Sequence, residues 1–397
     1  MSVSLPCKER FVLPDGVIYL DGNSLGPLPI SAMQRAQQTL EAEWGQQLIR
    51  AWNNAGWMAL PAVVGDQIAR IIGVPPGSVA TGDTLSIKVF QALAAALDRA
   101  PDRRVILSDS GNFPTDLYMA DGLANLLDRG YRISTPAPEE VLASINEDVA
   151  AVLLTHVDYR TGRLHDMQRI SAAAREAGAT MIWDLAHSAG AVPLQVFDSG
   201  AEFAIGCTYK YLNGGPGAPA FIYAHPDIVE QVEPALSGWL GHATPFAMAR
   251  EYQPAAATER FRVGTPPVVQ LSILHESLLL WDDIDLNALR AASVDLSELF
   301  IREIESRCPP LKLASPRDPA TRGSQVSFAF EHGYAAIQAL AARGVIGDFR
   351  EPDIMRFGFT PLYLDADDVI TAAEHIETVI TEELWRDPKF QVRSRVT

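Results

Sequence analysis

The sequence predicts an α/β fold in which a mostly parallel β-sheet is covered by helices on both faces. Two observations support this prediction. Between residues 105 and 224, short apolar runs of strand length alternate with helical patterns, as is typical of strand–helix–strand units. The run from Val149 to Leu154 is apolar at every position, as expected for a strand buried on both faces.

Helices are predicted where apolar residues recur at helical spacing. The expected ranges are 31–44, 61–72, 86–97, 116–129, 166–178, 268–281, 285–307 and 334–343, followed by a last helix with Val369, Ala373, Ile376, Ile380 and Leu384 at its apolar positions. Strands are predicted at 105–107, 149–154, 181–183, 203–207, 220–223 and 323–330, with two short strands within 345–359. The segment 79–87 is expected to be a small polar loop that leads into a helix.

These elements divide the chain into three parts. Residues 51–284 are expected to form a large domain around the parallel sheet, and residues 285–397 a smaller α+β domain. Residues 1–50 are expected to be an N-terminal segment that joins the small domain. A length of 397 residues leaves ample material for such an arrangement.

The charge balance argues against anionic macromolecules as partners. The chain carries 49 acidic and 32 basic residues, which gives a formal charge of −17 at pH 7. Its field therefore repels phosphate backbones and anionic lipid surfaces. With 48% hydrophobic and 20% charged residues, the composition is that of an ordinary globular protein. We expect neither nucleic acid nor a membrane among its partners.

Cysteine usage and the N-terminus indicate a reducing compartment. The three cysteines, Cys7, Cys207 and Cys308, are odd in number and far apart, which argues against a disulfide framework. The N-terminal residues lack the apolar core of a signal peptide, and no apolar run approaches the roughly 18 residues of a membrane-spanning helix. A cytoplasmic protein is therefore expected. HExxH, paired CxxC and EF-hand motifs are absent from the sequence, so no metal site is expected.

Lys210 is the first candidate for a reactive side chain. Among the five lysines, it alone follows an apolar strand and precedes a glycine-rich turn, Asn213-Gly214-Gly215. Partial burial at such a place would free its amine to form a Schiff base with an aldehyde. A solvated lysine on a loop explains this segment equally well.

Asp184 is the second candidate, at the end of the apolar run 181–183. Ligands of open α/β sheets bind beyond the carboxyl ends of the strands, so Asp184 and Lys210 are expected at one crevice. Pyridoxal phosphate (PLP) needs a lysine for its aldehyde and an acidic partner for its ring nitrogen, which these two residues could supply. Asp184 could equally be the N-cap of the next helix, and the two roles are compatible.

Five motifs appear in order along nearly the whole chain: YLDGNSLG at 19–26, NFPTDLY at 112–118, DLAHSAGAVP at 184–193, GCTYKYLNGGPG at 206–217 and MRFGFTPLY at 355–363. With them the sequence resembles the kynureninase family. The resemblance implies a PLP-dependent enzyme of fold type I, with a sheet of the seven-stranded type and a smaller α+β domain. It also implies hydrolysis of L-kynurenine to anthranilate and L-alanine in tryptophan degradation.

The resemblance implies most of the cofactor contacts. Lys210 would hold PLP and remove the Cα proton of the substrate, Asp184 would support the ring nitrogen, and His187 would orient Asp184. The other implied contacts are Tyr209 at the phosphate, where it also passes protons, Leu85 and Ser86 at the phosphate, Phe113 stacked on the ring, and Asp116 and Thr155 beside the cofactor. Without the resemblance, Phe113 would be a buried aromatic residue, and Asp116 and Ser86 helix caps.

Lys88 departs from the family pattern, which has a neutral residue at this position. It would either add charge near the phosphate or point to solvent. His156, which follows the strand at 149–154, has no partner at metal spacing and is expected to be packed in the interior.

Three residues are expected at the substrate. An arginine within an apolar strand is costly to bury unless it meets an anion, and a guanidinium can bind a carboxylate through two parallel hydrogen bonds. The resemblance implies that Arg356 binds the substrate α-carboxylate, and an internal salt bridge is the alternative. Trp52 would lie near the aromatic ring of the substrate. Asn23 belongs to the loop 19–26, which would approach the substrate.

Two loops resemble segments that reach a neighbouring subunit. Trp239 would contact the partner's cofactor phosphate, Thr265 its cofactor, and Gly264 its substrate. A homodimer with the cofactor site at the subunit interface is thus implied by the resemblance. Gly264 and Thr265 match the bacterial kind of this family, which favours L-kynurenine over its 3-hydroxy derivative.

Two other functions were weighed. A cysteine desulfurase or selenocysteine lyase of the same fold needs a mobile nucleophilic cysteine, for which Cys308 is the candidate. A catalytically silent binding protein that kept the PLP fold is the other alternative. The complete set of Lys210, Asp184, Phe113 and Arg356 argues against it.

Overall fold

A seven-stranded sheet forms the large lobe of the protein, in a computed structural model that describes residues 5–393. Its strands run in the order β4 (Val79–Thr81), β10 (Phe221–Ala224), β9 (Phe203–Gly206), β8 (Thr180–Asp184), β7 (Val149–Thr155), β5 (Val105–Leu107) and β6 (Arg132–Ser134). All neighbours from β9 to β6 pair in parallel, and only β10 is antiparallel to both its neighbours. The predicted mostly parallel sheet is confirmed.

Helices cover both faces of this sheet because its central strands are buried along their whole length and mostly apolar. Along β7, Val152 and Leu154 belong to one apolar cluster, whereas Ala151 and Leu153 belong to a second one on the opposite face. The first cluster contains side chains of α3 (Leu60–Ile72), α7 (Met167–Ala177) and α10 (Val268–Leu278), and the second those of α4 (Leu85–Arg99) and α5 (Pro114–Leu127).

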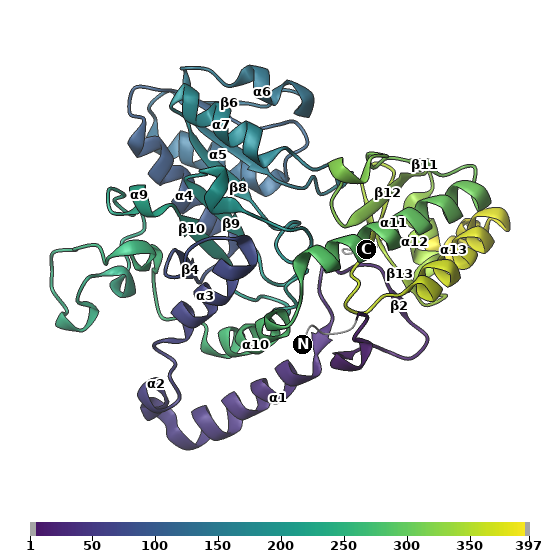
Figure 1. Ribbon diagram of the computed structural model, residues 1–397, viewed down its shortest axis with the longest axis horizontal. Coiled ribbons are helices and arrows are strands. Elements are labelled where there is room, and N and C mark those ends of the chain that lie inside the picture. The colour runs from purple at the N-terminus through teal and green to yellow at the C-terminus, as the bar shows by residue number, and fades with distance from the viewer. Residues whose placement is uncertain (1–4, 394–397) are drawn as a thin grey trace.

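A smaller lobe lies beside the large one (Figure 1) and contains an antiparallel sheet. Its strands run in the order β11 (Lys312–Leu313), β12 (Gln325–Ala329), β15 (Ile354–Gly358) and β14 (Asp348–Arg350), covered by α11 (Leu286–Arg307), α12 (Gly333–Ala341) and α13 (Ala366–Thr381). The N-terminal segment reaches this lobe, because β2 (Ile18–Tyr19) pairs in parallel with β13 (Val345–Ile346).

The remaining elements are short, apart from α1 (Ile30–Gln38), which runs along the lower edge of the large lobe next to α10 (Figure 1). They are β1 (Phe11–Val12), β3 (Leu28–Pro29), α2 (Ala51–Asn54), α6 (Val141–Ser144), α8 (Val196–Ser199), α9 (Pro226–Val229) and α14 (Pro388–Gln391).

Four sequence predictions were wrong in detail. The helix expected at 31–44 is regular only to Gln38 and continues as a π-helical turn, Thr39–Gly45. The segment 79–87 begins with β4, whose partner β10 lies far along the chain and leaves no local signal. The segment 345–359 holds three strands instead of two. Leu384 lies beyond the last long helix, in a 3₁₀ turn, Leu384–Arg386.

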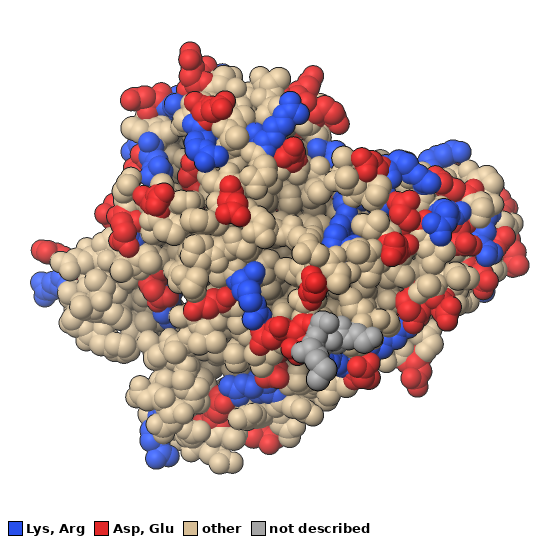
Figure 2. Space-filling model, viewed as in Figure 1, with Lys and Arg blue, Asp and Glu red and all other residues tan. Residues whose placement is uncertain are grey.

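The surface mixes charges of both signs. On the face seen in Figure 2, acidic and basic side chains are interspersed among neutral ones. No helix within residues 5–393 combines the length and apolarity needed to span a membrane.

Phe300 of α11 is a suitable test of the small-lobe core. Its ring is buried, with centroids 5.1 Å from Phe357 and 5.0 Å from Phe359. Phe300→Ala should therefore cost about 3–5 kcal/mol of unfolding free energy, because it removes buried area and leaves a cavity. Urea titration followed by circular dichroism measures this. Leu126→Ala is the control, since Leu126 is 71% exposed, and a similar loss in both variants would contradict the assignment of this core.

Candidate active site

The carboxyl ends of β7 and β8 bring the first two candidate residues together. Thr155 and Asp184 are paired across these strands. Asp184 is 2% exposed, and its Oδ1 accepts a hydrogen bond of 2.8 Å from the backbone N–H of Ala186. The carboxylate is thus held in place from one side by the turn that follows it.

Lys210 reaches this crevice from the turn that follows β9. Its Nζ lies 2.8 Å from Nε2 of His187, a residue three positions after Asp184. His187 is buried, and its Nδ1 has no hydrogen-bond partner. Burial and the charge of Lys210 lower the pKa of His187 well below its ordinary value, so the imidazole is neutral and its Nε2 can accept a hydrogen bond from the amine. The pairing of an acid and a lysine predicted from two strand ends agrees with this geometry.

A second buried acid faces the same crevice. Asp116 of α5 is 1% exposed, and its Oδ2 has no hydrogen-bond partner. Burial, followed by repulsion from Asp184, raises the pKa of Asp116 well above its ordinary value. Burial likewise raises the pKa of Asp184 to about 6. Two buried carboxyl groups share the single cation of Lys210, so this crevice suits a further positive group such as a pyridinium nitrogen.

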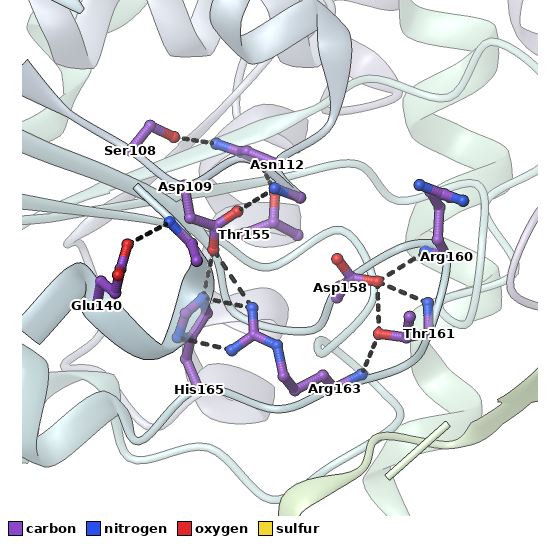
Figure 3. A network of polar contacts seen from close by, with 12 residues as sticks. Ser108, Asp109, Asn112, Glu140, Thr155, Asp158, Arg160, Thr161, Arg163 and His165 are labelled. Atoms are coloured by element: carbon purple, nitrogen blue, oxygen red, sulfur yellow. Dashed lines mark hydrogen bonds and ion pairs between the residues drawn. The ribbon is translucent and has the colours of Figure 1, made fainter. Parts of the chain in front are cut away.

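Asn112 fixes the two residues expected beside the cofactor ring. Its Oδ1 accepts from the hydroxyl of Thr155 and from the backbone N–H of Phe113, and its Nδ2 donates to Oγ of Ser108 at 2.9 Å. Figure 3 shows Asn112 with Ser108 and Thr155, and the neighbouring pair of Asp109 and His165, which cross-link the loops after β5 and β7. The Phe113 ring is 38% exposed, so a planar ligand could stack on it. No role was predicted for Asn112, although it is the first residue of the motif NFPTDLY.

The first turn of α4 is free to bind an anion. Thr84, its N-cap, has an extended backbone but makes no capping hydrogen bond through its side chain. Simple helix capping by Thr84 or Ser86 is the alternative to a phosphate site here, and the structure shows no such bond from the N-cap residue Thr84. The backbone N–H groups of Leu85 and Ser86 stand in this turn, at the positive end of the helix dipole, as a phosphate site requires.

Arg356 does form the internal salt bridge that was the alternative reading. Its Nε donates to Oδ1 of Asp348 at 2.6 Å, and its Nη2 donates to Oδ2 of Asp348 and to Oγ of Ser24. Its Nη1 donates to the carbonyl of Tyr159. Of five N–H donors, these contacts leave one for a ligand. Asp348 and Ser24 were missed in the sequence, although a buried arginine always calls for such a partner.

The loop 19–26 joins Arg356 to Lys210. The backbone N–H of Gly26 donates to the carbonyl of Tyr209 at 2.9 Å, and a Cβ on Gly26 would lie 2.3 Å from the carbonyl oxygen of Lys210. Asn23 is fully buried in this loop, and its Oδ1 and Nδ2 have no partner. The loop thus lies against the backbone of Tyr209 and Lys210 and carries an unsatisfied amide.

The other candidate residues gather elsewhere. Trp52, Trp239 and Thr265 line a separate cavity of about 470 Å³, whose walls include neither Lys210 nor Asp184. Trp239 is 40% exposed. Gly264 precedes Thr265 in the same loop and has open space around its Cα. Within one chain, the predicted site residues therefore form two groups.

Two further expectations concern Lys88 and Cys308. Lys88 neither points to solvent nor stands free near the phosphate turn, because its side chain is completely buried and hydrogen-bonded. Cys308 lies in the core at the end of α11, where burial raises its pKa to about 11. Cys308 is therefore not a mobile nucleophile, which argues against the alternative of a cysteine desulfurase or selenocysteine lyase.

Other reactive-looking groups are structural. His156 is packed as expected, with its Nδ1 2.9 Å from Oγ of Ser188 and its ring edge-on to Trp183. Within residues 5–393, no three His, Cys, Asp or Glu side chains are grouped so as to hold a metal ion.

Comparisons with known proteins agree on one family. A family model described as the kynureninase C-terminal domain matches residues 289–376. A protein named kynureninase from Pseudomonas fluorescens is 49% identical over 399 residues, covering 99% of this chain and 96% of the relative. A protein of the same name from Burkholderia pseudomallei (strain 1106a) is 50% identical with the same coverage.

Solved structures share the fold at low identity. The apo structure of a cysteine desulfurase from Thermococcus onnurineus NA1 has a TM-score of 0.81 at 17% identity, covering 96% of this chain and 99% of that one. A C-DES mutant with glycine covalently linked to its PLP cofactor has a TM-score of 0.78 at 19% identity, covering 94% and 99%. These likenesses confirm the predicted fold class.

The burial of Asp184 predicts a pH dependence of the protein without cofactor. Its pKa is about 6 in the folded chain against an ordinary 3.8, so the folded state keeps a proton that the unfolded chain has released. Stability should therefore fall as pH rises between about 4 and 6, by up to about 3 kcal/mol.

The measurement is urea unfolding of the cofactor-free protein at several pH values, compared with Asp184→Asn. The unfolding free energy of the variant should not show this decrease, so the variant should become more stable relative to the native chain as pH rises. Parallel pH curves for the two proteins would contradict the prediction.

Proposed function

The chain belongs to the kynureninase family, and we propose from this that it hydrolyses L-kynurenine to anthranilate and L-alanine in tryptophan degradation, with PLP as cofactor. The observation that supports it most is the Lys210–His187 contact of 2.8 Å beside the buried Asp184. The 3-hydroxy derivative would be a poorer substrate, because Gly264 and Thr265 match the bacterial kind of the family.

The residues present fit PLP. Lys210 would hold its aldehyde, Asp184 its ring nitrogen, and the amides of Leu85 and Ser86 its phosphate. Phe113 would stack on the ring, with Asp116, Thr155 and His187 around it. The carboxyl oxygen of Asp116 and the Nδ1 of His187 lack partners, and both could hydrogen-bond a polar ligand. When bound, PLP withdraws electrons from the substrate Cα.

The chain's own groups would then move the protons. Lys210, released when the substrate amine takes its place, would remove the Cα proton. Asp184 would stay ionised and keep the ring nitrogen protonated. Tyr209 would contact the phosphate and pass a proton toward the alanine carbon after water has attacked the γ-carbonyl.

Substrate orientation would depend on three groups. The remaining N–H of Arg356 would bind the α-carboxylate, and its guanidinium plane is already fixed by Asp348 and Ser24. Asn23 would complete this end of the pocket with its unsatisfied amide. Trp52 would lie near the aromatic ring.

A homodimer would combine the two groups of site residues. Trp239, Thr265 and Gly264 would complete the site of the neighbouring subunit. This proposal is supported by large apolar side chains that are exposed around the cavity of Trp52 and Trp239 and on the adjoining turn. They are Trp44, Leu48, Ile49, Phe246 and Met248. An exposed apolar patch of this kind is typical of an interaction surface.

The division into segments 1–50, 51–284 and 285–397 and the cytoplasmic location remain predictions.

Lys210→Ala tests the proposed activity. The variant should lose the absorbance of covalently held PLP, and its turnover should fall at least about 10³-fold, because both the covalent link and the base are removed. Turnover is followed through the fluorescence of anthranilate. Lys389→Ala is the matched control, since the Lys389 side chain is 66% exposed. A Lys210→Ala protein of native activity would refute the assignment.

Mixing two inactive variants tests the shared site. Lys210→Ala removes a residue from a subunit's own site, whereas Trp239→Ala removes one that would serve the partner. After dissociation and reassembly, hybrids with one intact site should restore about a quarter of native activity. Sedimentation velocity checks that dimers form. No recovery among hybrid dimers would exclude shared sites.

A further inference from the structure

Lys88 is a buried cation that the proposed mechanism does not use. It stands one turn into α4, and its side chain has no exposed surface. Its Nζ lies 3.1 Å from Oδ2 of Asp83, 2.9 Å from Oε1 of Gln91 and 3.4 Å from the carbonyl oxygen of Phe261. The amine therefore joins the start of α4 to the distant segment that contains Phe261.

This environment fits the charged form of the side chain. An ammonium group has three N–H donors and no acceptor, and Lys88 is surrounded by three oxygen acceptors. The Gln91 amide is oriented by its own Nε2, which donates to the Phe261 carbonyl at 3.0 Å, so that Oε1 faces the amine. Burial lowers the pKa of Lys88, and the Asp83 carboxylate opposes this shift.

Asp83 lies where an unpaired negative charge would weaken the binding of an anion. It directly precedes Thr84, the N-cap of α4, and its side chain is 33% exposed. Its φ of +57° is in the left-handed region, and its carbonyl accepts from Ala220 N–H at 3.1 Å, so its backbone position is held. A free carboxylate at this place would repel a phosphate bound to the amides of Leu85 and Ser86.

We propose that Lys88 is a positioning residue for phosphate binding, which neutralises Asp83 at the first turn of α4 and ties that turn to the segment Ala257–Phe261. The inference rests on the proposed function, since it takes the phosphate of PLP as the ligand of this turn. The tie also connects the turn to the loop of Gly264 and Thr265, which follows Phe261 by three residues.

The charge argument predicts opposite effects for the two partners. Lys88→Met leaves Asp83 unpaired and should weaken PLP binding on the order of 10-fold or more. Asp83→Asn leaves the cation unpaired and should tighten PLP binding or leave it unchanged. The double variant should return toward the native affinity, because both charges are gone.

The experiment measures dissociation constants of the cofactor-free full-length chain for PLP and for pyridoxal, which lacks the phosphate. Quenching of tryptophan fluorescence reports binding, and circular dichroism confirms that each variant is folded. The ratio of the two constants should change in Lys88→Met, with pyridoxal binding unaffected. A merely structural role would weaken both ligands alike.

Several outcomes would overturn the inference. Equal loss of PLP and pyridoxal binding in Lys88→Met, or an unchanged ratio, would do so. If Lys88→Met does not fold, Asp83→Asn serves as the test. An Asp83→Asn protein whose affinity for PLP falls relative to its affinity for pyridoxal would contradict the charge argument. Failure of the proposed function is distinct, because it would appear as a native chain that binds PLP but releases no anthranilate from kynurenine.

Discussion

The buried carboxylate of Asp184 at the end of β8 is the constraint on which the site depends. Removing a carboxylate from water is costly unless a cation or hydrogen bonds compensate it. Here Ala186 supplies one hydrogen bond, and the lysine beside His187 supplies the nearest cation. With Asp116 buried next to it, the crevice has more acid than base, so a positively charged ring would be stabilised there.

The sheet makes this arrangement possible. Parallel strands end at the same edge, so residues that follow β7, β8 and β9 in sequence meet in space. Strands that are apolar on both faces can be covered by helices on both sides, which leaves this edge as the natural place for polar groups. The positive end of the α4 dipole would favour an anion at the same lobe.

The small lobe is connected to the candidate site by a chain of side-chain and backbone contacts, and not by pairing with the large sheet. Arg356 is fixed by Asp348 and by Ser24 of the N-terminal loop, and that loop in turn touches the backbone at Tyr209. A change in the relative position of the lobes would therefore alter the distance between the lysine and the arginine. Residues 19–26 thus physically link the guanidinium of Arg356 to the backbone beside Lys210.

The amino-acid sequence by itself predicted the fold class, contained the motifs of the family and pointed to Lys210 and Asp184 as candidate site residues, because apolar runs and the polar residues that end them are local features. The tertiary structure alone decided which partners buried polar groups find. The contact of Ser24 with Arg356, the contact of Lys88 with Phe261 and the pairing of β4 with β10 all join positions far apart in the chain. Periodicity shows that a side chain is buried, but it carries no information about what packs against it.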